Sequence, residues 1–328
     1  MKSLKKFLSI ILMSCLIIGM FSGCEKSSSG SGGSTKVLFL MTDTKDTFRG
    51  LLSKAIVKAA KDDGIDLKMV ETGESIEEQL KLVKNAKAEG YTAIIMRVAD
   101  PDVALQMQVA SNDIPIIYVN AQPSDTILEP NKYVYVGSAE EQAGLYQAEY
   151  AWEKLGKPNS FNAVILEGEK GHSATIGRTT AIKNYFKDNG VDVNYVFVDF
   201  CDWDSDETEE KLGIFFNTKQ KYDVVFCNND SMALGAVKAL KKHGDSLEKV
   251  PVLGVDATAD GCQSIKNGEM QFTVLQDANG QAKYAVETSK ALSLGKKVSS
   301  VKYADKGDKY VWVPFKKIDS SNVSSVSQ

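Results

Sequence analysis

The chain has little of what several classes of protein require. Its 328 residues include only two histidines, His172 and His243, and neither lies beside a cysteine or serine in a known nucleophile motif. The glycine-rich motifs that bind dinucleotides and nucleotide phosphates are absent, as is the HExxH motif of zinc proteases. With 25 glycines, 7 prolines and 5 cysteines, the composition excludes collagen, low-complexity disorder and a disulfide-dense miniature scaffold. An enzyme is therefore not the first expectation, and no cofactor is expected.

Charge and length narrow the class further. Acidic residues outnumber basic ones by 43 to 39, and three of the lysines fall in the first 23 residues, which hold no acid. The remainder is therefore more negative than the net charge of −4 for the whole chain, so a nucleic-acid partner is not expected. At this length a single core usually stops growing, and two lobes of roughly 150 residues are expected.

The N-terminal segment predicts export. Three lysines precede an apolar run over residues 7–21, which is shorter than the roughly twenty residues of a membrane-spanning helix and fits the core of a secretory signal. Small residues before Cys24 and a Ser/Gly-rich stretch after it resemble a bacterial lipoprotein signal. That resemblance implies a signal peptide over residues 1–23, lipidation of Cys24, and a flexible tether over residues 24–35. The body of the protein would then be held outside the cytoplasm on the membrane.

Three cysteines remain for the folded part, namely Cys201, Cys227 and Cys262. An odd number cannot pair completely, and none of the three has CxxC spacing. One bridge stays possible, but buried free thiols are the expectation, because Cys227 ends an apolar strand pattern.

From residue 36 onward, short β-rich runs alternate with longer stretches of helical period. Because the runs are apolar along their whole length, they predict parallel sheets covered on both faces, which is an α/β fold. Two helix starts, at residues 75–78 and 138–141, fit the capping box. The predicted strands are 37–41, 67–70, 93–96, 114–119, 133–136, 161–166, 191–198, 222–227, 250–255 and 272–275.

A repeat links the two halves of the chain. The sequence IPIIYVNA at 114–121 matches VPVLGVDA at 250–257, and YTAIIM at 91–96 matches YDVVFC at 222–227. The offsets, 136 and 131 residues, are similar and follow the same order, which predicts two copies of one α/β unit. In open sheets of this kind, ligands bind at the carboxyl ends of the strands.

Polar and aromatic side chains follow the predicted strands at those ends. Both halves contribute them, so the site is expected between the two lobes. A sugar matches the set, since its hydroxyls both donate and accept hydrogen bonds and its C–H faces pack on flat rings. The residues are Asp46, Phe48, Asn120, His172, Arg178, Trp203, Asn229, Asp256 and Gln276.

These residues also have ordinary structural explanations. Asp46 and the two asparagines fit helix caps or turns, the two aromatics fit core positions, and the histidine fits an exposed loop. Only their shared placement after strands in both halves favours the functional interpretation. Residues 202–206 open like a calcium loop, but Glu207 stands where such a loop needs glycine. A negatively charged helix start is therefore expected there, and no metal.

Several segments together resemble the periplasmic sugar-binding proteins of the ribose/galactose type, which are type I solute-binding proteins of ABC transporters. Within that family the galactose/glucose branch is the most similar. The segments are GH and RTT at 171–172 and 178–180, NNDSMALGAV at 228–237, VLGVDA at 252–257 and TVLQDANGQAK at 273–283. The similarity spans nearly the whole mature chain, and it implies two Rossmann-like lobes with parallel sheets, joined by a three-segment hinge.

The resemblance also implies a role for each site residue. Phe48 and Trp203 would sandwich the sugar ring, and the seven polar residues would bond its hydroxyls. Ala174 stands where the galactose/glucose branch has an aspartate that contacts the anomeric hydroxyl. Weaker binding of a free aldose, or a pocket opened for a sugar substituted at that carbon, would follow. The calcium loop of the family is missing, since residues 154–159 are short and hold no carboxylate, so again no metal is expected.

Family members have three crossings between lobes, implied here near residues 137–138, 276–277 and 311–314. The resulting boundaries are 36–137 with 278–311 for the first lobe, and 138–277 with 312–328 for the second.

The function implied by the resemblance is the capture of a galactose/glucose-like aldohexose, or its glycoside, for delivery to an ABC transporter permease. A lipid-anchored monomer is expected. A sensing role at a chemoreceptor or sensor kinase is the alternative, and an enzyme acting on sugars is a third. A repressor is disfavoured, because a signal peptide stands where a helix-turn-helix would be.

Overall fold

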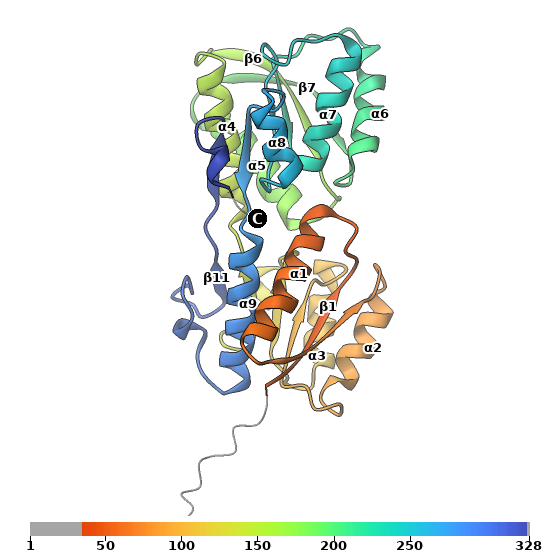
Figure 1. The fold of residues 1–328 in the computed structure, drawn as a ribbon, viewed down its shortest axis with the longest axis vertical. Coiled ribbons are helices and arrows are strands. Elements are labelled where there is room, and N and C mark those ends of the chain that lie inside the picture. The colour runs from red at the N-terminus through yellow and green to blue at the C-terminus, as the bar shows by residue number, and fades with distance from the viewer. Residues whose placement is uncertain (1–34, 327–328) are drawn as a thin grey trace, which may run out of the picture. The chain divides into compact units, whose positions relative to one another are not determined.

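Two six-stranded sheets organise the part of the chain that the computed structural model describes, residues 35–326 (Figure 1). The strands of the first sheet are β1 (Lys36–Met41), β2 (Asp66–Glu71), β3 (Ala93–Met96), β4 (Ile116–Val119), β5 (Tyr133–Gly137) and β11 (Tyr310–Trp312). Those of the second sheet are β6 (Ser160–Glu167), β7 (Asp192–Phe200), β8 (Val224–Cys227), β9 (Val252–Leu253), β10 (Phe272–Leu275) and β12 (Lys316–Asp319). Their spatial orders are β11-β5-β4-β3-β1-β2 and β12-β10-β9-β8-β6-β7.

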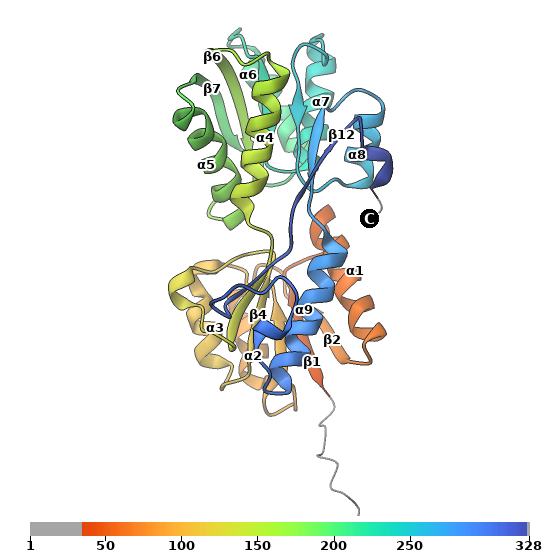
Figure 2. The same cartoon turned by 90° about the vertical axis from the view of Figure 1, so that its left-hand side faces the viewer.

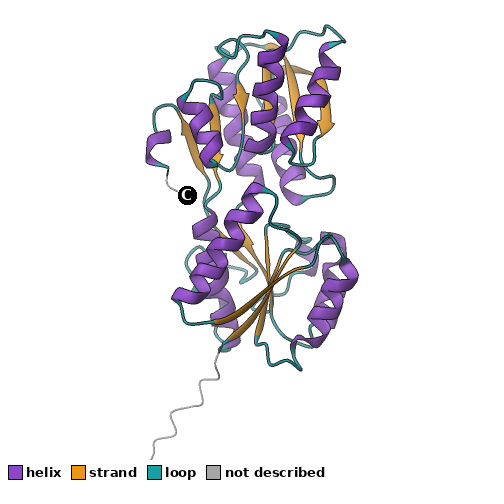
Figure 3. Ribbon diagram, turned by 45° about the vertical axis from the view of Figure 1, so that its right-hand side comes forward, coloured by secondary structure: helices purple, strands orange, loops and turns teal. Residues whose placement is uncertain are grey.

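Helices cover both faces of each sheet (Figure 3). On the first sheet, α1 (Thr47–Asp62) and α9 (Ala278–Ser293) pack on one face, and α2 (Ile76–Ala86) and α3 (Ala104–Ala110) on the other. On the second sheet, α6 (Ser205–Phe216), α7 (Asp230–His243) and α8 (Ala259–Lys266) pack on one face, and α4 (Glu140–Lys154) and α5 (Ser173–Asp188) on the other. We call each sheet with its helices the first and the second lobe. Single 3-10 turns lie at Pro101–Val103, Asp125–Ile127, Val298–Ser300 and Val323–Ser325.

The apolar strands owe their composition to this double cover. Along β1, Val37, Phe39 and Met41 contact the core under α1 and α9, whereas Leu38 and Leu40 contact the core under α2 and α3. Because alternate side chains point to opposite faces, a strand with helices on both sides must be apolar throughout. The predicted α/β class with two parallel-sheet lobes is confirmed.

All ten predicted strands are present, and the repeat has its counterpart in space. Strands β3 and β8, which carry one pair of matching segments, hold the same place in the two sheet orders, as do β4 and β9, which carry the other. The sheets differ at one edge, since β11 runs parallel to β5 but β12 runs antiparallel to β10. Strands β11 and β12 were not predicted, because each is only three or four residues long and has little apolar signal.

Of the two helix starts predicted from capping boxes, the N-cap at Ser75 is confirmed and the one at Ser138 is wrong. Ser75 caps α2, and its side chain accepts a hydrogen bond from Glu78 N. Helix α4 instead has Ala139 at its N-cap, without a side-chain bond. The buried Ser138 hydroxyl accepts a bond from Gln281 Nε2 of α9 at 3.1 Å, so a tertiary contact replaces the local cap.

The described chain passes between the lobes three times (Figure 2): from β5 to α4, from β10 to α9, and from β11 to β12. The bond between Ser138 and Gln281 joins the first of these passages to the helix that follows the second. The lobe boundaries given above stay a prediction.

The expected signal peptide and Cys24, with the tether up to residue 34, lie outside the described residues. Within residues 35–326, no helix is both long and apolar enough to cross a membrane. The three cysteines of the folded part, Cys201, Cys227 and Cys262, are free and buried, as expected, and burial raises the pKa of each thiol.

Candidate functional site

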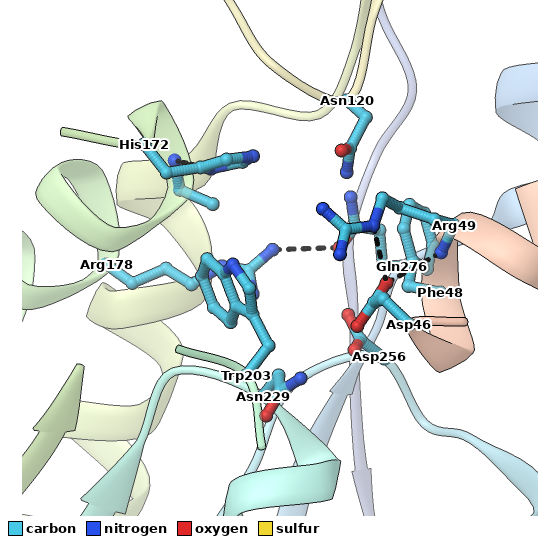
Figure 4. Close-up of a pocket in the computed structure, with 11 residues that line it drawn as sticks. Asp46, Phe48, Arg49, Asn120, His172, Arg178, Trp203, Asn229, Asp256 and Gln276 are labelled. Atoms are coloured by element: carbon cyan, nitrogen blue, oxygen red, sulfur yellow. Dashed lines mark hydrogen bonds and ion pairs between the residues drawn. The ribbon is translucent and has the colours of Figure 1, made fainter. Parts of the chain in front are cut away.

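One pocket brings together all the residues singled out in the sequence. Its cavity measures about 30 Å³, well below the range typical of small-molecule sites, so the lining side chains nearly fill it (Figure 4). Side chains of both lobes line it, and they come from the carboxyl ends of strands or the first turns of the helices that follow. The lining residues are Asp46, Phe48, Arg49, Asn120, His172, Ala174, Arg178, Trp203, Asn229, Asp256 and Gln276.

Three of these side chains are helix caps as well as lining residues. Asp46 accepts a bond from Arg49 N at 2.8 Å, Asn229 from Met232 N at 2.9 Å, and His172 Nδ1 from Ala174 N at 3.1 Å. The capping explanation therefore holds for Asp46 and Asn229, and it does not compete with a place in the pocket. The exposed-loop explanation for His172 is wrong, because this side chain is buried.

The two aromatic rings lie on opposite sides of the pocket (Figure 4). Phe48 is only 4% exposed and also belongs to the core under α1, so its structural explanation holds too. Trp203 packs so closely on Gly168 that a Cβ added there would meet the ring at 2.1 Å. The imidazole of His172 stands edge-on to the Trp203 ring, with 5.3 Å between ring centroids. The indole therefore has little freedom to move.

Close packing on Gly168 gives a direct test of the indole's position. Replacing Gly168 by alanine is expected to displace Trp203 and weaken ligand binding about tenfold, because a 2.1 Å contact cannot persist. Gly213→Ala in α6 is the matched control, since a Cβ there meets nothing within 4 Å. Calorimetric titration of both variants measures the difference, and equal affinities would show that the indole is not confined by this glycine.

Three lining residues hold an unusual backbone conformation. The φ angles of Asn120, Trp203 and Asp256 are 63°, 66° and 113°, in the region that favours glycine. Such strain costs about 1–3 kcal/mol per residue and is concentrated at functional sites. The backbone thus sets these three side chains in place at a cost in stability.

Arg178 is the most firmly held cation of the pocket. Its side chain is 3% exposed, and Nε donates to Glu140 Oε2 at 2.8 Å. Nη2 donates to Gln276 Oε1 at 2.8 Å, and Nη1 donates to the Asn228 carbonyl. Burial raises the pKa of Glu140, although Arg178 opposes the shift. Glu140 was not predicted from the sequence, and its contribution is to keep the guanidinium fixed.

A second set of charged residues, Arg49, Arg97 and Glu169, was not predicted from the sequence. Arg49 lines the pocket, and its Nη1 donates to Glu169 Oε1 at 3.0 Å. Arg97 Nη2 donates to Glu169 Oε2 at 2.8 Å, and Arg97 Nε donates to Asn120 Oδ1 at 3.1 Å. Arg97 directly follows β3 and Glu169 closely follows β6, so both meet the strand-end criterion that found the other residues.

Protonation states give the pocket both donors and acceptors. Burial lowers the pKa of His172 well below its ordinary value, and Arg97, Arg178 and Arg49 add to the effect. Because Nδ1 accepts a bond, the proton of the neutral ring is assigned to Nε2, which is then a donor. Burial raises the pKa of Asp46 and raises that of Asp256 well above its usual range, against the influence of Arg49 and Arg178 respectively.

The segment that opens like a calcium loop is the start of a helix. Asp204 caps α6 by accepting bonds from Asp206 N and Glu207 N, both at 2.8 Å, as a charged helix start requires. Among residues 35–326, no group of three or more His, Cys, Asp or Glu side chains is placed to hold a metal ion.

Comparisons with known proteins agree with this geometry. Residues 37–297 match the family model described as periplasmic binding protein domain. The D-galactose/methyl-galactoside binding periplasmic protein of Haemophilus influenzae is 30% identical over 85% of this chain and 87% of its own length. The ribose import binding protein of Bacillus subtilis is 25% identical over 90% of this chain and 95% of its own length. A crystal structure of an ABC transporter solute binding protein from Bacillus halodurans, with bound myo-inositol, is 27% identical, covers 90% of this chain and 98% of its own, and superposes with a TM-score of 0.79.

Proposed function

Because the chain belongs to the periplasmic binding protein domain family, we propose that it captures one monosaccharide outside the cytoplasm and delivers it to an ABC transporter. The resemblance to the ribose/galactose type of sugar-binding proteins is confirmed. The chain is a solute-binding protein and not an enzyme. The observation that carries the proposal is a pocket flanked by two aromatic rings, with amides, carboxylates and cations supplied by both lobes.

The mechanism is a change in the balance between open and closed forms. Ligand contacts from both lobes can exist together only when the lobes meet, so a bound sugar favours the closed form. We assign the hinge to the three passages between the lobes, with the boundaries given from the sequence. A permease that recognises the closed form would then receive loaded protein in preference to empty protein.

The direction of each hydrogen bond defines what the ligand must offer. Asn120 Oδ1, Asn229 Oδ1 and His172 Nδ1 all accept bonds from within the protein, so each of these side chains has a donor left for the ligand. Asp46 and Asp256 add acceptors. A ring of hydroxyls can satisfy both kinds of group, whereas an epimer would leave a buried group unpaired at a cost of about 1–3 kcal/mol.

The favoured ligand is a hexose substituted at its anomeric carbon. Ala174, which lines the pocket and is 3% exposed, offers a methyl group where the galactose/glucose branch has an aspartate. An ether oxygen needs no acceptor there, whereas a free hydroxyl does. The Haemophilus influenzae relative is named for methyl-galactoside as well as galactose, which supports this choice. The Bacillus halodurans structure holds myo-inositol, which makes a cyclitol the main rival.

Calorimetric titration with D-glucose, D-galactose, methyl β-D-galactopyranoside and myo-inositol tests the proposal. Tightest binding of the glycoside is expected. Tighter binding of both free sugars than of the glycoside would contradict the proposed substituent, and no heat with any of the four would contradict the proposed hexose or cyclitol class.

Ala174→Asp is expected to reverse the preference. The restored carboxylate would accept a bond from the anomeric hydroxyl, and a charged hydrogen bond is worth about 1.5–3 kcal/mol, or tenfold and more in affinity for free D-galactose. Ala174→Ser is the control, because it adds a polar group without the charge. If Ala174→Asp binds D-galactose no better than the serine variant, the anomeric carbon does not lie at this position.

We further propose that Cys24 carries the lipid that anchors the protein. Substituting Cys24 by alanine should release the protein from the membrane fraction. Uptake of labelled sugar by a deletion strain separates transport from the sensing alternative, since retained uptake with lost induction would favour sensing.

A further inference from the structure

Glu169 links the two lobes without lining the pocket. It lies in the second lobe, between β6 and α5, and both of its carboxylate oxygens accept bonds from arginines of the first lobe. The distances are 3.0 Å to Arg49 Nη1 and 2.8 Å to Arg97 Nη2. By contrast, the hydrogen bond that Gln122 N of the first lobe donates to Ser173 Oγ of the second, at 3.0 Å, joins two neutral groups.

Each arginine is connected to the pocket, Arg49 directly and Arg97 through Asn120. Arg49 lines the pocket itself and is 9% exposed. Arg97 is almost fully buried, and its Nε bond to Asn120 Oδ1 fixes the amide so that Nδ2 is the atom left for a ligand. The position of one carboxylate thus decides the position of a cation and the orientation of an amide.

Separation of the lobes would remove a countercharge that the two arginines share. Arg49 and Arg97 share Glu169, and both also approach Glu74, at 3.8 and 3.3 Å. The two guanidinium groups therefore lie close together, and like charges at short range repel. Glu74 is 55% exposed, so water screens it far more than it screens Glu169, which is 30% exposed. Asp43 of the first lobe, which lies 3.2 Å from Arg49 Nη2, also balances Arg49. For Arg97, Glu169 is the better-placed countercharge, and it belongs to the opposite lobe.

We propose that Glu169 is a positioning residue of the binding site, which sets Arg49 and, through Arg97, Asn120 in their binding positions as the lobes close. This inference rests on the proposed function. Arg49 then becomes a ligand contact, because its buried Nε has no hydrogen-bond partner among the described residues, although Asp46 Oδ1 lies 3.9 Å away. A ligand oxygen could accept this bond.

Glu169→Gln tests the proposal, since it keeps the shape and removes the charge. The matched control is Glu78→Gln, which breaks an exposed pair with Lys81 within α2. Calorimetry uses D-galactose, methyl β-D-galactopyranoside and myo-inositol as probes. Affinity for any probe that binds is expected to fall about tenfold in Glu169→Gln, because fewer molecules hold the competent arrangement, and to stay unchanged in the control. In an Arg49→Met background the same substitution should cost much less, since the two residues act together.

A measurement without ligand separates positioning from a structural role. Arginine Nε–H signals in the ligand-free protein report on the contact of Arg97 with Asn120, and their exchange with water should quicken in Glu169→Gln. Unchanged affinity and unchanged exchange would overturn the proposal. The proposal would also be overturned if Glu169→Gln lost affinity and folding stability to the same extent while the exchange of the Arg97 Nε–H signal stayed unaltered. If no probe binds the unsubstituted protein, the proposed ligand class fails, while the exchange measurement still decides the role of Glu169.

Discussion

Replacing Arg178 by methionine is expected to abolish ligand binding and to lower the free energy of unfolding by about 3–5 kcal/mol. The guanidinium is the partner of Glu140, whose side chain is 3% exposed, and without it a carboxylate would be buried alone. The same substitution removes the bond that Arg178 donates to Gln276 Oε1 at 2.8 Å. Chemical denaturation measures the stability, and calorimetry measures the binding.

A double variant separates the two effects of this change. Adding Glu140→Gln to Arg178→Met removes the stranded charge, so part of the lost stability should return while binding stays lost. If the free energy of unfolding of Arg178→Met lies within about 1 kcal/mol of that of the original protein, Glu140 does not depend on Arg178 for its stability in the buried site. A lysine at 178 would not be conservative, because its single ammonium nitrogen cannot reach the three acceptors that separate guanidinium nitrogens bond.

Replacing Trp203 by alanine is expected to weaken sugar binding by about 3 kcal/mol, or more than a hundredfold. The indole forms one side of the pocket, and an aromatic ring that buries a sugar face contributes by its large apolar area. Loss of stability should be smaller than loss of binding, since Trp203 is only half-buried.

Fluorescence gives this prediction a matched control. The chain has three tryptophans, and Trp152 is also half-buried but lies on α4, where its Nε1 donates to the Pro158 carbonyl. Because Trp312 ends β11 at a passage between the lobes, the test uses a Trp312→Phe background. There Trp203→Phe should remove the change in emission on sugar binding, and Trp152→Phe should leave it intact. A ligand-induced change that survives in Trp203→Phe would place the sugar away from this ring.

The strands were predictable because a sheet covered on both faces requires runs of apolar residues. Ten such runs in the sequence correspond to ten strands, while β11 and β12 were too short to give a signal. The cap expected at Ser138 failed for a different reason. A capping box describes local bonds only, and here a helix 143 residues away in sequence supplies the donor.

The pocket was predicted better than the groups that support it. A strand-end criterion places a polar residue near a site, but it does not reveal which partner holds that residue. Glu140 begins a helix, and nothing local indicates that it pairs with Arg178, 38 residues later. Arg97 and Glu169 followed strands and could have been found, yet their shared contact depends on how the two lobes meet.

The left-handed backbone at Asn120, Trp203 and Asp256 has a consequence for engineering the protein. Glycine would relieve the torsional cost at each of these positions, but it would also delete the side chain. Selection of variants for heat resistance alone would therefore favour glycine there and gradually produce a tougher scaffold that no longer distinguishes one solute from another.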